Sequence, residues 1–105
     1  MPKTIPELTA DMHAFVAAKG WYAADSVRPQ TPRNLATSLA IESAELLELY
    51  QWRAEAERDA LAGELADVAL YLLQLASIAG VDLEQAIADK LRLNYGRSWP
   101  TTGGG

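Results

Sequence analysis

Four acidic residues at helical spacing are the part of this sequence most capable of chemistry. They form an E-x-x-E motif at 42–45 and an E-x-x-D motif at 64–67. Side chains three residues apart lie on one face of a helix, so each motif points two carboxylates the same way. Two such helices side by side would bring four carboxylates together, and like charges held that close repel unless a cation lies between them. Oxygen ligands of this kind suit Mg²⁺ or Mn²⁺.

A helical wheel drawn at about 100° per residue places one of these acids among apolar residues. Glu42 falls within the apolar stripe of its segment and Glu45 lies at its edge, whereas Glu64 and Asp67 flank the later stripe, next to Tyr71. A carboxylate in an apolar stripe is costly unless it is paired or bound to a metal. The pattern therefore favours a metal site over solvated charges on ordinary amphipathic helices. The stripes are Leu35, Leu39, Leu46 and Leu49 in the first segment and Leu61, Leu65, Val68, Leu72 and Leu75 in the second.

The length and composition predict one small domain. The chain has 105 residues and a mass of 11.4 kDa, and half of its residues are hydrophobic. We expect a single domain over 1–100 and a disordered, glycine-rich tail over 101–105. A domain of this size buries only part of its apolar surface, so oligomerisation is expected.

Charge and cysteine content exclude several classes of function. The net charge is −5 and the pI about 4.7, which argues against nucleic acid as a partner because its backbone requires a basic face. The chain has no cysteine, which excludes disulfides, zinc–thiolate sites and cysteine nucleophiles. The N-terminus lacks an apolar signal region and no apolar run approaches about 18 residues. We therefore expect a cytoplasmic protein without a membrane partner.

The periodicity of apolar residues predicts four helices, and no segment alternates as a strand does. We expect helices over about 5–19, from 32 to about 52, over about 59–79 and over about 83–95. Thr31 and Asp82 are suitable N-caps, the latter with Gln85 as a capping-box partner. The two central helices have a short connection, so they should pack as antiparallel neighbours with their acidic motifs facing each other.

The arrangement of motifs resembles the all-α nucleoside triphosphate pyrophosphatases, the MazG-like superfamily, and most closely its small dCTP-pyrophosphatase-type branch. The core of the resemblance is E-x-x-E, the eighteen residues 46–63, and then E-x-x-D. The R-N-L sequence at 33–35, E-L-Y-Q-W at 48–52 and K-L-R-L-N-Y-G-R at 90–97 are also similar to that branch. The resemblance implies a four-helix MazG-like bundle with an antiparallel central pair that oligomerises through its helices.

The resemblance also implies a reaction, the hydrolysis of a nucleoside triphosphate between its α and β phosphates to a monophosphate and pyrophosphate. Metal ions can clamp a polyphosphate, offset its charge and lower the pKa of a bound water, which is the expected nucleophile. Glu45 is the first candidate to take the proton of that water, and Glu48 is either a second candidate or a surface acid. The four motif acids match the Mg²⁺ ligands of the family, with Mn²⁺ as a possible substitute: Glu42, Glu45, Glu64 and Asp67.

Further residues are expected to hold the nucleotide. Three polar residues at i, i+4 and i+7 share a helical face that can contact the phosphates, unless they form a solvated basic helix end. They are Lys90, Asn94 and Arg97. Bases are held by stacking and by a few polar groups, and the candidates are Trp21, Asn34, Trp52 and Tyr71. Trp52 and Tyr71 could equally be core or interface residues, and Trp99 is a candidate packing anchor.

Several alternatives remain open at this stage. The resemblance favours deoxycytidine nucleotides in a house-cleaning role, but purine or modified nucleotides remain possible, as does hydrolysis of phosphoribosyl-ATP. A non-catalytic helical oligomerisation or binding module would keep the apolar stripes without needing Glu42 in one. His13 has no E-x-x-H context and is interpreted as a surface or satisfied core residue, which argues against a di-iron site. Family members assemble through helices, so a homodimer or homotetramer is expected.

Overall fold

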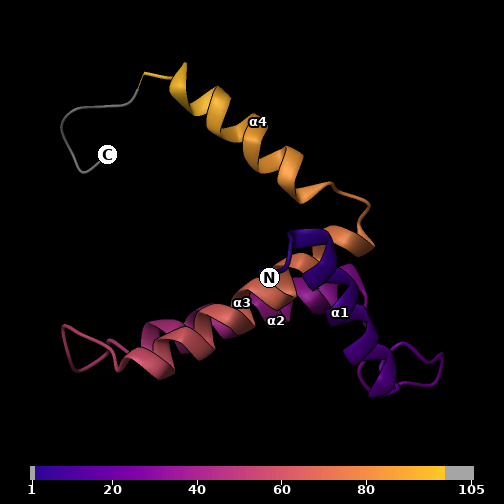
Figure 1. The fold of residues 1–105 in the computed structure, drawn as a ribbon. Helices are drawn as coiled ribbons and strands as arrows, with labels where there is room; N and C mark the ends of the chain where they lie inside the picture. The colour runs from indigo at the N-terminus through magenta and orange to yellow at the C-terminus, as the bar shows by residue number, and fades with distance from the viewer. Residues whose placement is uncertain (1, 99–105) are drawn as a thin grey trace.

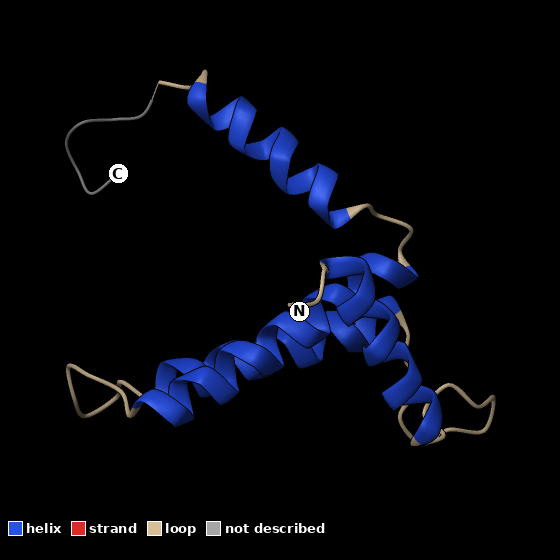
Figure 2. Ribbon diagram, in the orientation of Figure 1, coloured by secondary structure: helices blue, strands red, loops and turns tan. Residues whose placement is uncertain are grey.

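Residues 2–98, which the computed structural model describes, form four α-helices and contain no strand (Figures 1 and 2). The expected all-α class is therefore confirmed. The helices are α1 (Ile5–Ala18), α2 (Pro32–Glu48), α3 (Arg58–Ile78) and α4 (Leu83–Tyr95). The predicted tail at 101–105 and the predicted anchor Trp99 lie outside the described residues.

Local side-chain chemistry sets most of the helix ends. The Thr31 hydroxyl accepts a hydrogen bond from the backbone N–H of the third residue of α2 at 3.2 Å, and Asp82 accepts one from Gln85 at the start of α4. Both caps satisfy amides that have no partner within the helix. After α1 and α3 the chain turns at Gly20 (φ 77°) and Gly80 (φ 74°), where a left-handed conformation favours glycine.

Two local predictions need correction. The second helix ends at Glu48 rather than near Trp52. The backbone N–H of Leu49 bonds to the residue three back, at 3.2 Å, so the last turn tightens and the helix does not continue. The capping box at α4 is only half formed, because the Gln85 amide donates to Asp89 at 2.8 Å instead of returning to the cap.

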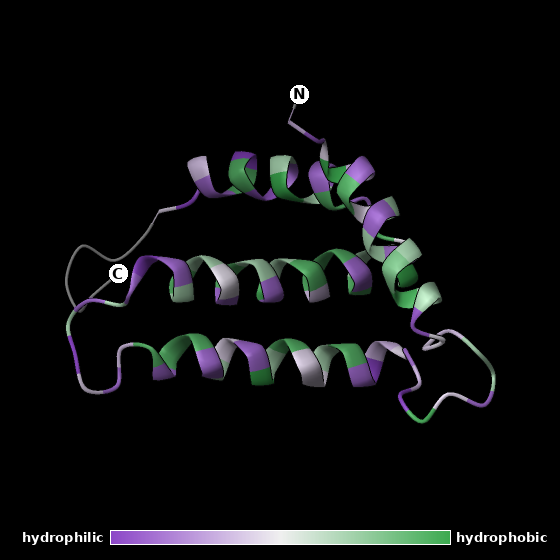
Figure 3. Cartoon of the chain, turned by 60° about the horizontal axis from the view of Figure 1, so that its bottom comes forward, coloured by the Kyte–Doolittle hydropathy of each residue, from purple (hydrophilic) through white to green (hydrophobic). Residues whose placement is uncertain are grey.

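The core lies where α1 and α2 pack against α3. The helices α2 and α3 run side by side and antiparallel, as the short connection predicted (Figures 1 and 3). The buried residues are Met12, Val16, Leu35, Leu73 and Gln74. The predicted stripe of α3 is wrong in part, because Leu65 and Leu72 are 49% and 40% exposed. Because α3 packs against both α1 and α2, the face that it buries contains Leu73 and Gln74 instead.

The last helix stands apart from this core. Figure 1 shows α4 leaving the end of α3 and lying away from the α2–α3 pair. No residue between Leu83 and Tyr95 is buried, and the apolar side chains of Ile87 and Leu91 are about half exposed. Apolar surface of this kind commonly marks an interaction surface.

The hydropathy of α3 is higher than the sequence analysis expected. Among residues 2–98 it is the one helix long and apolar enough to cross a membrane, with a mean hydropathy of 1.4 over 18 residues. A single such helix is weak evidence for a span, because core helices of water-soluble proteins meet the same criterion. Its acids Glu64 and Asp67 lie opposite a carboxylate of α2 in the packed structure.

Candidate active site

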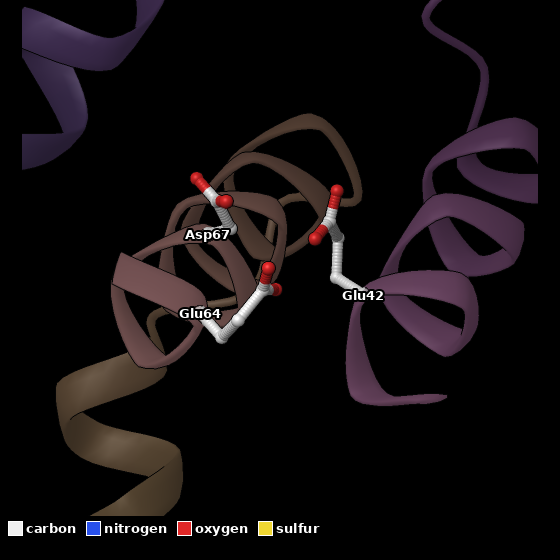
Figure 4. Close-up of side chains that lie close together, drawn as sticks. All are labelled: Glu42, Glu64 and Asp67. Carbon is white, nitrogen blue, oxygen red and sulfur yellow. The ribbon is translucent and has the colours of Figure 1, made fainter. Parts of the chain in front are cut away.

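Three of the four predicted metal ligands converge between α2 and α3. Figure 4 shows Glu42 reaching from α2 toward Glu64 and Asp67 on α3. One carboxylate oxygen from each lies within 4.8 Å of the others. Glu42 and Glu64 are half-buried and Asp67 is exposed. The helical spacing of each motif and the antiparallel pairing of the helices together produce this cluster.

The cluster is electrostatically strained as it stands. The Glu45 carboxyl, which can share a proton with Glu42, is the main cause that raises the pKa of Glu42 from 4.5 to about 7. Partial burial contributes next, followed by Glu64 and the charge of Asp67. One oxygen each of Glu42 and Glu64 is fully buried with no hydrogen-bond partner among residues 2–98. Buried oxygens of this kind require a proton or a cation.

The two remaining acids of α2 lie at different distances from this cluster. Glu45 is half-buried and adjoins Glu42, but its oxygens do not join the three that lie within 4.8 Å. Glu48 is exposed and lines a separate cavity of about 330 Å³ with Trp52 and Arg53. The geometry therefore groups Glu45 with the carboxylate cluster and Glu48 with the connection between α2 and α3.

A cavity of about 700 Å³ adjoins the carboxylates, and Asp67 belongs to its wall. Three of the four predicted base-binding residues line it: Trp21, Asn34 and Tyr71. The fourth, Trp52, is 88% exposed and lies at the smaller cavity. A cavity of this size, with aromatic walls and a few polar groups, suits a small organic ligand.

The predicted phosphate-binding residues are not brought to the carboxylates by this single chain. Lys90, Asn94 and Arg97 lie on α4 and just beyond it, on the helix that stands apart in Figure 1. Lys90 and Arg97 are exposed, whereas Asn94 is half-buried and its Oδ1 has no hydrogen-bond partner within residues 2–98.

The cavity contains residues that the sequence analysis did not select. Phe15 meets Trp21 edge to face, with ring centroids 5.8 Å apart, and the Arg28 guanidinium lies 5.5 Å from the Trp21 ring centroid. Gln30 and Gln74 add two amides to the wall. Only Gln74 had a usable sequence signal, since it is a polar residue in an apolar run two turns after Asp67.

The single histidine is a satisfied structural residue, in agreement with its interpretation from sequence. His13 is half-buried, and its ring nitrogens lie 2.5 Å from the Tyr22 hydroxyl and 2.7 Å from the Ser77 hydroxyl. It does not belong to the carboxylate cluster.

Comparison with known proteins places this architecture in a family. Residues 37–101 match the MazG-like family. The dCTP pyrophosphatase 1 of Rattus norvegicus is 38% identical in an alignment of 97 positions that covers 82% of this chain and 54% of that protein. The chain thus spans about half the length of the curated relatives it matches first.

Solved structures show the same fold. A pyrophosphatase from Archaeoglobus fulgidus superimposes with a TM-score of 0.74 at 31% identity, covering 90% of this chain and 91% of the other. The MazG-like pyrophosphohydrolase of cyanophage S-2L, solved with dGDP and three catalytic Mn²⁺ ions per active site, has a TM-score of 0.72 at 32% identity and covers 100% and 91%. With its matched motifs, its four helices and its paired carboxylates, the chain belongs to the MazG-like family.

Proposed function

We propose that this protein is a divalent-metal-dependent pyrophosphohydrolase that cleaves nucleoside triphosphates between the α and β phosphates. The observation that carries the proposal is the cluster of Glu42, Glu64 and Asp67 at the edge of a cavity large enough for a nucleotide. The carboxylates suit the metal–phosphate end of such a substrate, and the aromatic cavity suits its base. The similar proteins named as pyrophosphatases support this assignment.

The residues present fit a divalent cation. The cluster offers only oxygen ligands, which are preferred by Mg²⁺ and Mn²⁺. Two of these oxygens are buried without a hydrogen-bond partner in residues 2–98, and their neighbours raise the pKa of Glu42. A bound cation would remove both costs. We propose Mg²⁺ as the usual ion and Mn²⁺ as a substitute; the cyanophage relative was solved with Mn²⁺.

Bound metal would supply charge neutralisation of the polyphosphate and activation of the attacking water. Glu42, Glu64 and Asp67 would hold the metal, since their oxygens already converge. Glu45 adjoins this group from the next turn of α2, which supports the proposal that it would accept the proton of the attacking water. Glu48 lies at the other cavity, so a role in proton transfer is less well supported for it than for Glu45.

The proposed substrates are deoxynucleoside triphosphates, with dCTP favoured and removal of unwanted nucleotides as the role. The rat relative is named for dCTP and the cyanophage relative was solved with dGDP. Trp21 and Tyr71 would supply aromatic walls for a base, and Asn34 lines the same cavity.

We further propose that the protein acts as a homodimer or homotetramer, in which a second copy completes the site. The exposed apolar residues of α4 would be covered in such an assembly. Lys90 and Asn94 on that helix, and Arg97 just beyond it, would then reach the phosphates of a neighbouring site rather than their own. The separation of α4 from the α2–α3 pair supports this arrangement.

A panel of nucleoside and deoxynucleoside triphosphates, incubated with and without Mg²⁺ or Mn²⁺, tests the reaction. The expected products are a monophosphate and pyrophosphate, formed only with metal. Glu42→Gln should lose this activity, whereas the exposed loop variant Glu55→Gln should retain it. Release of a diphosphate and phosphate would refute the proposed bond, and equal turnover without metal would refute the role of the carboxylates.

A further inference from the structure

A chain of hydrogen bonds crosses the wall of the large cavity and is not explained by the reaction at the carboxylates. It joins the segment between α1 and α2 to α3, and Gln74 is its central member. Gln74 is only 3% exposed yet contributes to the cavity wall. Buried amides in proteins are almost always hydrogen-bonded, so the orientation of this one is set by its partners.

The direction of the chain is fixed at its first member. The backbone carbonyl of Arg28 can only accept a hydrogen bond, so the Gln30 atom 2.6 Å from it is the amide nitrogen. The oxygen of the Gln30 amide therefore faces Gln74, at 2.8 Å. Because that oxygen also only accepts, Gln74 must present its nitrogen, Nε2.

The chain continues from Gln74 to His13. A second hydrogen of Gln74 Nε2 goes to the Tyr22 hydroxyl at 3.2 Å, and the same hydroxyl bonds to His13 Nδ1 at 2.5 Å. His13 Nε2 in turn bonds to the Ser77 hydroxyl at 2.7 Å. Either neutral tautomer of His13 satisfies both of its bonds, because the Tyr22 and Ser77 hydroxyls can each donate or accept, and in both cases Tyr22 accepts from Gln74.

As a result, the Gln74 amide can offer a ligand a hydrogen-bond acceptor but no donor. Both hydrogens of the Gln74 amide are engaged by Tyr22 and Gln30, which leaves Oε1 as its free group. That oxygen receives no hydrogen bond from residues 2–98, and it is not among their fully buried unpartnered atoms. Because Gln74 lines this cavity, Oε1 is the group that it would offer to a ligand that carries an N–H.

The position of Gln74 along α3 suits the base end of a nucleotide. Glu64, Asp67, Tyr71 and Gln74 follow one another at spacings of three, four and three, which keeps them on one helical face. At 1.5 Å per residue, Gln74 lies about 10 Å along the axis from Asp67. A triphosphate at the carboxylates would thus extend past Tyr71 and bring its base to Gln74.

We propose that Gln74 is a specificity-determining residue that selects nucleobases with an exocyclic amino group, such as cytosine, over bases with an oxo group there. A freely rotating amide could serve both, since it reads an amino group with its oxygen and an oxo group with its nitrogen. The bonds to Tyr22 and Gln30 remove the second option. This inference rests on the proposed function, because it assigns the base subsite of the same nucleotide site.

The Asn34 amide complements this selection. Its nitrogen donates to the Pro29 carbonyl at 2.9 Å and retains a second hydrogen. Cytosine presents ring acceptors beside its amino group, so an Asn34 N–H and the Gln74 oxygen offer it a donor and an acceptor. Uracil would set its 4-oxo oxygen against the Gln74 oxygen, and the mismatch would leave both acceptors unpaired.

The test compares kcat/KM for dCTP, dUTP and the 2-pyrimidinone deoxynucleoside triphosphate, which lacks only the amino group of cytosine. The wild-type protein should favour dCTP over both by about 10-fold or more. Tyr22→Phe should release one amide hydrogen, so that the dCTP/dUTP ratio falls at least about 3-fold, mainly through faster use of dUTP. Gln74→Met, which keeps the volume without the amide, should bring the ratio close to one.

Tyr50→Phe is the matched control, because Tyr50 is as exposed as Tyr22, at 39%, and belongs to neither cavity. Its dCTP/dUTP ratio should remain that of the wild type. A purely structural role for Tyr22 would lower the rates for dCTP and dUTP together and leave their ratio unchanged. Equal use of dCTP and dUTP by the wild type, or a ratio that survives in folded Tyr22→Phe, would overturn the proposal.

Calorimetric binding of the α,β-imido analogues of dCTP and dUTP separates this inference from the hydrolase proposal. If no nucleotide is hydrolysed but imido-dCTP binds about 10-fold more tightly, and Tyr22→Phe loses that preference, the base subsite stands and the proposed reaction is refuted. If dCTP and dUTP are both hydrolysed with metal but the analogues bind equally, the reaction stands and the role of Gln74 is refuted. Should Gln74→Met fail to fold, Tyr22→Phe and the 2-pyrimidinone substrate still decide the outcome.

Discussion

Replacing Glu42 with glutamine should stabilise the metal-free protein, in a manner that depends on pH. Neighbouring carboxylates raise the pKa of Glu42 from 4.5 to about 7. Each pKa unit corresponds to 1.36 kcal/mol, so the shift corresponds to at most about 3 to 4 kcal/mol. Glu42 is only half-buried, and solvent screening reduces the expected effect to about 1–2 kcal/mol.

The sign follows from proton binding. The folded protein holds the Glu42 proton more tightly than the unfolded chain does, so the free energy of unfolding should fall as pH rises from about 4.5 to about 7. Glu42→Gln carries no charge at any pH and should escape this loss. At pH 8 the metal-free variant should therefore melt at least about 4 °C above the wild type, and at pH 4 the two should be similar.

Thermal unfolding followed by circular dichroism, in EDTA and then in excess Mg²⁺, measures both parts of this argument. Metal should stabilise the wild type, by about 2.7 kcal/mol at 100 times Kd, and should stabilise Glu42→Gln much less. Glu55→Gln, an exposed loop change, should behave as the wild type does. A metal-free Glu42→Gln protein that melts below the wild type at pH 8 would refute the account of crowded, repelling carboxylates.

Three further predictions concern activity. Asp67→Asn should lower kcat by more than about 100-fold while circular dichroism shows an intact fold, because loss of even an outer partner of a metal ligand costs 10–100-fold; near-normal turnover would contradict its role as a ligand. Lys90→Ala should be inactive alone, but mixing and reassembly with Glu42→Gln should restore about a quarter of wild-type activity if dimers share residues between sites; no recovery would place Lys90 outside a shared site. Trp21→Ala should raise KM for the preferred nucleotide about 10-fold through lost stacking, measured by steady-state kinetics, and an unchanged KM would remove Trp21 from the base subsite.

Features set by local sequence were predicted well. The range of α4 agrees with the prediction, because the residues directly before and after the helix, Asp82 and Gly96, mark its two ends. The carboxylate cluster was also predictable, since a spacing of three fixes the direction of each pair and a short connection makes the helices antiparallel. The early end of α2 was missed, because its last turn tightens after Glu48 without a glycine or proline to signal it.

Features set by contacts between distant segments could not be predicted. The apolar spacing of α3 did not reveal that Leu65 would face outward while Gln74 became buried, since that depends on how α1 and α2 together cover the helix. The bond between His13 and Ser77 joins residues 64 positions apart, so periodicity carries no trace of it. The cavity partners of Trp21 likewise come from α1 and from the segment before α2.

The polar residues that interrupt the apolar sequence of α3 point to one ligand rather than to separate structural needs. Glu64 and Gln74 place polar groups on parts of α3 that other helices cover, where a purely structural helix would favour apolar residues. The polar groups change in kind along the axis of α3. Carboxylates lie at one end, and the oriented amide oxygen of Gln74 lies about 10 Å farther along the helix. Repelling anions suit a metal-bound polyphosphate, whereas a lone acceptor suits an amino group. A nucleoside triphosphate carries both features at its opposite ends.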